Sequence, residues 1–323
     1  MPMPGFLAWI FPIAIISFGA GLVSGQDYPS KPIRIVTAEP GGSSDFAARV
    51  IAQGLSRNFG HKVVVENRGG GSGIIAAQTV AKAPPDGYTL LYYGPAIWLL
   101  PFLQDNVPYD PVRDFSPITL PVRSPNILVV HPSLPVRSVK ELIALAKARP
   151  GELNYGSASR GSASHLAPEL FKVMAGVHIV QVSYKGGGPA LIDLIAGQVQ
   201  LMFGSATSVA PHLRSGRLRA LAITSAQPSA LLPDLPTIAA SGLPGYEAVS
   251  IYGMFAPANT SATIINQLNQ EIVRVLNTPN AKEKFFSVGV ETVGSSPEQL
   301  AAAIKTDMAR MGKVIKDASI RAD

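Results

Sequence analysis

Cysteine is absent from the 323 residues of this chain, and charged residues make up only 15% of them. The missing thiols exclude disulfides, thiolate metal sites and cysteine nucleophiles. Lys and Arg exceed Asp and Glu by 27 to 21, a net charge of +6, yet the basic residues form no long tract. Because nucleic-acid-binding proteins concentrate such charge on one face, no nucleic-acid partner is expected, whereas a mild positive charge suits anionic ligands.

Long hydrophobic runs are also missing, except at the N-terminus. Residues 1–25 contain no charged side chain, and an apolar stretch covers residues 6–18. Small residues at positions 23–25 then fit an export cleavage site, which predicts a cleavable signal peptide over residues 1–25. No Lys or Arg precedes the apolar stretch, so an uncleaved N-terminal membrane anchor is the alternative.

Short β-branched runs alternate with helical patterns in the rest of the chain. The series begins with a strand at residues 33–37, a glycine turn, a helix over residues 46–59 and a strand at residues 62–66. Strand, glycine turn and helix in this order predict βαβ units, and hence an α/β fold with mostly parallel sheets flanked by helices. Ligands bind at the carboxyl ends of such strands.

The chain is long enough for two lobes, and residues 101–125 are where it is expected to cross between them, because this Pro- and Asp-rich stretch has no clear period. A second series of strands and helices follows, whereas the C-terminal helices have no sheet of their own. We therefore expect a discontinuous first lobe, residues 26–124 plus 225–323, around a second lobe of residues 125–224. Two crossings make a hinge.

One glycine turn has the features of an anion site. Gly41, Gly42, Ser43, Ser44 and Asp45 join a strand to a helix, so that backbone N–H groups and the positive end of the helix dipole converge on one point. Glycines also let a ligand approach the backbone closely. Helix capping by Ser44 or Asp45 alone would explain the same pattern.

A second turn has the same features in the other lobe. Residues 155–165 place Ser157, Arg160, Gly161 and Ser162 just ahead of a helix. A flexible Ser/Gly connection is the alternative interpretation. Arg160 could pair with a carboxylate through two parallel hydrogen bonds, or it could point into solvent.

Two further glycine-rich turns resemble nucleotide motifs only in part. Lys185 and Gly186 lie between a strand and a helix, but the P-loop order G-x-x-x-x-G-K-[ST] is not met. Residues 71–76 fit G-x-G-x-x-A, yet no acidic residue follows at the distance that a dinucleotide site requires. A small dinucleotide-dependent enzyme is therefore the weakest alternative.

Catalytic and metal sites have little support in the sequence. No G-x-S-x-G motif occurs, and Ser164 and His165 are adjacent, so their side chains would point in different directions on a helix. A histidine at a helix start more often packs or caps than acts as a base. The 5 histidines show no H-x-x-x-H spacing, so neither a metal nor a cofactor is expected.

Ordered motifs across the chain resemble the Bug receptors, the periplasmic solute-binding proteins of tripartite tricarboxylate transporters, which are also called TctC-like. The matching segments are YPSKPIR at residues 28–34, PGG ahead of Asp45, PPDGYTL at residues 84–90, PYDP at residues 108–111 and SYKGGGPA at residues 183–190. The resemblance implies a two-lobed periplasmic binding protein fold with the ligand cleft between the lobes.

The resemblance also implies function: a receptor, not an enzyme, that closes on a small organic acid and delivers it to integral membrane subunits of a transporter. A di- or tricarboxylate or an aromatic acid is expected as the ligand, and the receptor is expected to be a monomer. A soluble hydrolase with a Ser/His site in the same cleft is the alternative.

The residues expected to bind the ligand come from both lobes, and the resemblance itself implies those of the first turn together with Ser157, Gly161 and Ser162. The full set is Gly41, Gly42, Ser43, Ser44 and Asp45 from the first turn, with Asp45 aligning the turn, and Ser157, Arg160, Gly161, Ser162, Lys185, Gly186 and Gly204 from the second lobe. Family members usually carry acids where this chain has Gln200 and Gly204. Their loss makes the cleft more positive and favours a doubly anionic ligand.

Overall fold

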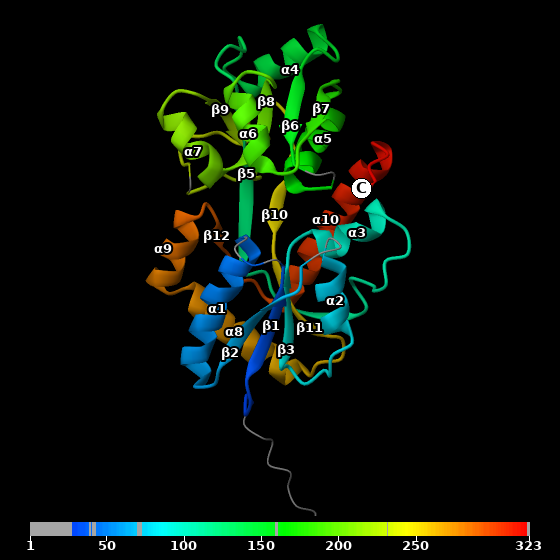
Figure 1. Ribbon diagram of the computed structural model, residues 1–323, viewed down its shortest axis with the longest axis vertical. Helices are drawn as coiled ribbons and strands as arrows, with labels where there is room; N and C mark the ends of the chain where they lie inside the picture. Colours follow the sequence, from blue (N-terminus) through cyan, green and yellow to red (C-terminus); the bar gives the residue numbers. More distant parts are fainter. Residues whose placement is uncertain are drawn as a thin grey trace, which may run out of the picture.

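The computed structural model describes residues 28–38, 40, 43–69, 73–158, 161–230 and 232–321. The predicted signal peptide, residues 1–25, lies outside this set, as do Gly41, Gly42 and Arg160. The described chain forms two lobes, one above the other, and each is built on its own sheet (Figure 1).

The first lobe is built on a sheet in the order β2-β1-β3-β11-β4. Its strands are β1 (Ile33–Thr37), β2 (Val63–Asn67), β3 (Thr89–Tyr93), β4 (Phe115–Thr119) and β11 (Gly253–Pro257). β1 runs parallel to β2 and β3, whereas β11 is antiparallel to β3 and β4. β11 comes from the C-terminal part of the chain, so this sheet is assembled from two distant segments.

The second sheet has the order β10-β5-β8-β6-β7, and β9 and β12 also pair with β5. Its strands are β5 (Val122–Val130), β6 (Asn154–Ser157), β7 (Val180–Ser183), β8 (Leu201–Ser205), β9 (Arg219–Ile223), β10 (Val249–Ile251) and β12 (Glu291–Thr292). β6 is parallel to β7 and β8, and every described partner of β5 is antiparallel to it.

The two-lobed α/β fold predicted from the sequence is confirmed, but its sheets contain more antiparallel pairing than the βαβ rhythm indicates. Strand β4 lies inside residues 101–125, where no regular element is predicted. It contains Pro117, which cannot donate a backbone hydrogen bond. β4 tolerates this proline because it is the last strand in the order of its sheet, paired with β11.

Helices cover both sheets. They are α1 (Ser43–Phe59), α2 (Ile74–Ala81), α3 (Ala96–Leu103), α4 (Val139–Ala148), α5 (Ala163–Ala175), α6 (Gly187–Ile195), α7 (Ala206–Arg214), α8 (Ala262–Leu276), α9 (Pro279–Ser287) and α10 (Pro297–Asp317). In α1, Ala47, Ile51 and Leu55 recur every four residues and are buried, because one face of the helix packs on the first sheet.

Strands β5 and β10 connect the lobes (Figure 1). The first half of β5 pairs with β10 and β12, and its second half pairs with β8 and β9. Between β9 and β10 the chain stays with the second lobe, since Ala248 N–H donates to Thr224 O at 2.9 Å and Ile223 N–H donates to Pro236 O at 2.9 Å. The division at residues 124 and 224 stays a prediction, and these contacts favour a later second crossing, in β10.

Helix α10 joins the lobes along one side. It packs against α3 and β4 of the first lobe and against α5 of the second. Trp98 of α3, Leu166 of α5 and Met311 of α10 belong to one buried apolar cluster. Burying each such side chain contributes roughly 1.5–3 kcal/mol, so this cluster stabilises the junction of the lobes on the side of α10.

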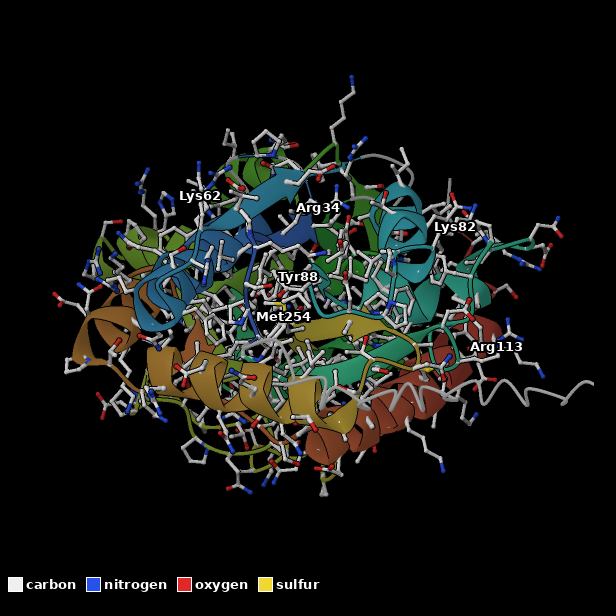
Figure 2. The ribbon with its side chains drawn as sticks, turned by 90° about the horizontal axis from the view of Figure 1, so that it is seen from below. Arg34, Lys62, Lys82, Tyr88, Arg113 and Met254 are labelled. Carbon is white, nitrogen blue, oxygen red and sulfur yellow. The ribbon has the colours of Figure 1, made fainter. Side chains whose placement is uncertain are left out.

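The far end of the first lobe is closed by packed side chains. Figure 2 views this end, with Tyr88 and Met254 near its centre and Lys62, Lys82 and Arg113 toward its rim. Tyr28 donates a hydrogen bond to Gly87 O at 2.7 Å, and its ring lies 5.1 Å from that of Tyr88. These contacts fix the N-terminal end of the described chain to the loop before β3.

Candidate functional site

Two adjoining pockets lie between the lobes. The larger has a volume of about 460 Å³ and the smaller about 250 Å³. Ser162 and Ala163 of the second lobe line both pockets, as do Ser250 and Tyr252 in and after the crossing strand β10. The pockets therefore form one cleft whose floor is the hinge.

The larger pocket is lined by polar groups without charge. Among the described lining residues, none is Lys, Arg, Asp or Glu. Those with a polar side chain are Ser43, Ser124, Asn126, Ser162, Ser164, Ser205, Thr207, Ser208, Ser250 and Tyr252. Hydroxyl groups can donate or accept, so the hydrogen-bonding character of the pocket is set by the backbone around it.

Four helices begin at this pocket. Ser43 starts α1, Ala163 is the first residue of α5, Gly187 is the first residue of α6, and Ser205 immediately precedes α7. The first-turn N–H groups of a helix have no partner within the helix, and the helix dipole places partial positive charge there. Together the helices give an uncharged pocket a preference for anions.

Three of the four helices that start at the pocket lack a side-chain cap. In α5, α6 and α7 no side chain at the cap position accepts from the first turn. Four helices that begin elsewhere do have such a cap, from Ser138, Ser261, Thr278 and Ser296. α2 and α3 lack such a cap as well, and Ala96 at the start of α3 lines the smaller pocket. The first-turn donors of α5, α6 and α7 are therefore not taken up by cap side chains.

The first predicted ligand turn is only partly described. Gly41 and Gly42 lie outside the described residues, while Ser43 lines the larger pocket and Ser44 the smaller. Asp45 is buried and accepts from Arg49 Nε at 3.0 Å and from Asn67 Nδ2 at 2.8 Å. Its carboxylate thus ties the turn to β2, in agreement with an aligning role.

Some residues of the second predicted turn line the cleft, and others hold the turn in place. Gly161 and Ser162 line the cleft, whereas Arg160 lies outside the described residues. Ser157 is fully buried, and its hydroxyl accepts from Gln181 Nε2 at 2.9 Å and donates to Ala158 O at 3.0 Å. Ser157 therefore holds the loop from beneath.

Position 161 requires glycine for two reasons, its backbone conformation and the lack of space for a side chain. Its φ is +76°, and a Cβ added there would lie 2.8 Å from Leu103 Cδ1 of α3. The loop of the second lobe thus touches the first lobe at this point. Any larger residue would push the lobes apart or distort the turn.

In the turn before α6, the residues that line the larger pocket are the neighbours of the two that were predicted. Lys185 is exposed and Gly186 precedes α6, whereas the residues that line the larger pocket are Gly187 and Gly188. Gly204 also lines this pocket, and a Cβ there would meet Val209 Cγ1 at 2.6 Å. Gly204 therefore allows α7 to start close to strand β8.

The hinge supplies cleft residues that sequence analysis missed. Ser124 and Asn126 of β5, Ser250 of β10 and the following Tyr252 line the larger pocket. Ser124 and Ser250 are direct partners in the antiparallel pairing of β5 with β10. In the sequence, Ser124 and Asn126 are two positions apart, which places them on the same face of an extended strand.

The smaller pocket is mostly apolar, but Asp307 of α10 lines it. Burial raises the pKa of Asp307, while the hydrogen bond from Trp98 and the nearby Arg310 act in the opposite direction. Trp98 Nε1 donates to Asp307 Oδ2 at 2.8 Å. The carboxyl group is thereby committed to the contact between α3 and α10.

His165 supports the second turn from within its own lobe. Its Nδ1 accepts from Gly161 N–H at 2.9 Å, and its Nε2 lies 4.0 Å from Glu169 Oε1. Lys172 Nζ in turn lies 2.7 Å from the same oxygen. This geometry fits a packing and positioning role for His165.

The described part of the chain contains no cluster of three or more His, Asp or Glu side chains suited to a metal ion. Within the same residues, no helix combines the length and the hydropathy needed to cross a membrane.

The model of the TctC family, described as the tripartite tricarboxylate transporter family receptor, matches residues 47–320. The BugT protein of Bordetella pertussis is 38% identical over 301 residues, which cover 92% of this chain and 92% of that protein.

Solved structures give the same result. A protein of R. palustris with adipate is 41% identical, has a TM-score of 0.76, and aligns over 91% of this chain and 99% of its own. MatC from Rhodopseudomonas palustris with bound malate is 29% identical, has a TM-score of 0.70, and aligns over 89% of this chain and 100% of its own.

Proposed function

Because the chain belongs to the tripartite tricarboxylate transporter receptor family, whose members are periplasmic solute-binding proteins, we propose that its cleft binds a small organic carboxylate. The receptor then delivers this ligand to the integral membrane subunits of a tripartite transporter. We also propose export by cleavage of residues 1–25, action as a monomer, and binding without chemical conversion.

The observation that carries this proposal is the convergence of uncapped helix starts on an uncharged pocket. α5, α6 and α7 begin there without side-chain caps, and Ser43 brings the start of α1. A carboxylate can accept from several of these N–H groups at once, and each such hydrogen bond to a charged group is worth about 1.5–3 kcal/mol. No countercharge on the protein is needed.

Binding at the junction of the lobes also explains how closure would be driven. Ser43 and Ser44 come from the first lobe, whereas Gly161 and Ser162 come from the second. A ligand that accepts hydrogen bonds from both sides favours the closed arrangement by its differential affinity for it. Gly41, Gly42 and Arg160 remain part of this proposed site.

The related structures support the chemical class. One is described with adipate and another with bound malate, and both molecules are dicarboxylates at neutral pH. The net charge of +6 adds a weak long-range attraction for such anions.

A thermal-shift panel tests the proposal. The purified mature chain is unfolded with mono-, di- and tricarboxylates and aromatic acids, each beside its uncharged methyl ester. A ligand at 100 times its Kd should stabilise the fold by about 2.7 kcal/mol, while its ester should not. Stabilisation by esters and acids alike would contradict carboxylate recognition, and conversion of any ligand into product would contradict the receptor function.

A further inference from the structure

Asn126 carries a hydrogen-bonding group with no use inside the described protein. The residue lines the larger pocket, is 8% exposed, and its Nδ2 has no hydrogen-bond partner among the described residues. Its backbone is fully engaged, because Asn126 N–H donates to Thr224 Oγ1 at 2.8 Å and Asn126 O accepts from Thr224 N–H at 2.9 Å. These bonds fix the backbone of Asn126 beside the pocket, while its buried Nδ2 is left without a partner among the described residues.

The start of helix α7 lies beside this amide. Asn126 and Ser205 are direct partners in the antiparallel pairing of β5 with β8, and Ser205 immediately precedes α7. The Ser205 hydroxyl donates to Ser208 Oγ at 2.9 Å instead of capping the helix. The free amide and the uncapped first turn of α7 therefore border the same part of the pocket, and all of these groups favour an acceptor.

We propose that Asn126 and the first turn of α7 form a second anion subsite, which reads the far carboxylate of a dicarboxylate ligand. This inference rests on the proposed carboxylate-binding function and adds to it the ligand class and the residue that determines it. The first carboxylate is held where α1 and α5 begin, and the second at the hinge. An amide presents its donor to such a group by rotation about χ2 at little cost.

The dipole of α7 disfavours a cationic far group at this subsite. A ligand amine would meet the partial positive charge at the start of this helix. An alkyl end would leave the buried amide without a partner. A carboxylate oxygen satisfies both groups, so the subsite should separate di- from monocarboxylates.

The test compares ligands of equal length by calorimetric titration. Succinate, glutarate, adipate and malate are each paired with the monocarboxylate of the same carbon number. Asn126→Asp keeps the side-chain shape but replaces the donor with a negative charge, and Asn126→Ala removes the amide. The control is Asn280→Asp, the same exchange at an exposed position in the first turn of α9.

The wild type should prefer a dicarboxylate to its monocarboxylate. Asn126→Asp should weaken that dicarboxylate at least 30-fold and Asn126→Ala about 10-fold. Each should weaken the matched monocarboxylate by a clearly smaller factor, whereas Asn280→Asp should change the binding of either ligand less than 3-fold. Equal losses for both ligands, or none, would overturn the subsite and leave carboxylate binding intact. A wild type that prefers monocarboxylates would also overturn the subsite alone. A wild type that binds no carboxylate would overturn the proposed function as well.

Discussion

Trp98 on α3 and Asp307 on α10 are joined inside the first lobe by a buried hydrogen bond, with 2.8 Å between Nε1 and Oδ2. Burial raises the pKa of the Asp307 carboxyl group in the folded protein. A group with a raised folded-state pKa stabilises the fold fully below its unfolded-state pKa, about 3.9 for Asp, and loses this contribution as pH rises through the folded-state value. Asp307 thus makes the fold more stable in mild acid than at neutral pH, relative to a group that cannot ionise.

Asp307→Asn tests this directly, since the amide oxygen can still accept from Trp98 but cannot ionise. The Tm of the variant minus that of the wild type should increase from pH 4 to pH 7 in ligand-free protein. Asp234→Asn, at an exposed position, is the control and should give a smaller change. A difference that stays constant or shrinks with pH would show that Asp307 is not disfavoured as a charge.

Gly161→Ala should destabilise the protein more than Gly216→Ala. Both glycines have positive φ, +76° and +70°, but a Cβ meets Leu103 at 2.8 Å only at Gly161, and Gly216 has open space. We expect about 1–2 kcal/mol for the backbone at either site, and about 1–3 kcal/mol more at Gly161 from overpacking. Urea unfolding measures the loss of stability for both variants. When Leu103 is already replaced by alanine, Gly161→Ala should cost no more than Gly216→Ala. Equal losses for the two glycines would contradict the contact between the lobes.

Ser162→Ala should change the stability of the ligand-free protein very little, although a serine stands at the cap position of α5. The matched change Ser296→Ala removes a capping box at the start of α10 and should cost about 1 kcal/mol. Chemical denaturation of both variants decides the point. A cost for Ser162→Ala as large as that for Ser296→Ala would mean that α5 is capped after all.

Asn67→Ala should destabilise the first turn through the loss of three side-chain hydrogen bonds, one of them accepted from Arg49 Nη2 at 3.1 Å. Asn67 Nδ2 donates to Ala38 O at 2.7 Å and to Asp45 Oδ1 at 2.8 Å. Leaving these acceptors unpaired should cost about 1–3 kcal/mol in urea unfolding. Arg49→Ala is the comparison and should cost less, because the Arg49 side chain is 56% exposed and solvent screens its charge, while Asp45 keeps its hydrogen bond from Asn67. The reverse order would place the main support of the turn on Arg49.

Local sequence patterns predicted much of the fold. The strand expected at residues 33–37 is β1, because the β-branched run IRIVT is buried along nearly its whole length. Strand β4 escaped detection, since Ser116 and Pro117 read as a turn until β11 is present to pair with them. β11 lies more than a hundred positions later, and only tertiary pairing brings it there.

Residues that line the cleft were predictable from the sequence where they stand in a turn, and not where they stand in a strand. Ser43, Gly161 and Ser162 stand in glycine-containing turns next to helices, and the structure places them in the cleft. Asn126 and Ser250 stand in strands β5 and β10 of the hinge and line the larger pocket only when these strands pair. No local pattern records that pairing.

Calorimetric titration of carboxylates into three proteins tests the central claim, that the cleft between the lobes is the binding site. Ser208→Trp fills the larger pocket at the start of α7, and Ser215→Trp adds the same bulk at the exposed far end of that helix. We predict saturable binding at one site per chain in the wild type and in Ser215→Trp, and its loss in Ser208→Trp that still unfolds cooperatively. Undiminished binding by a folded Ser208→Trp variant would contradict the claim.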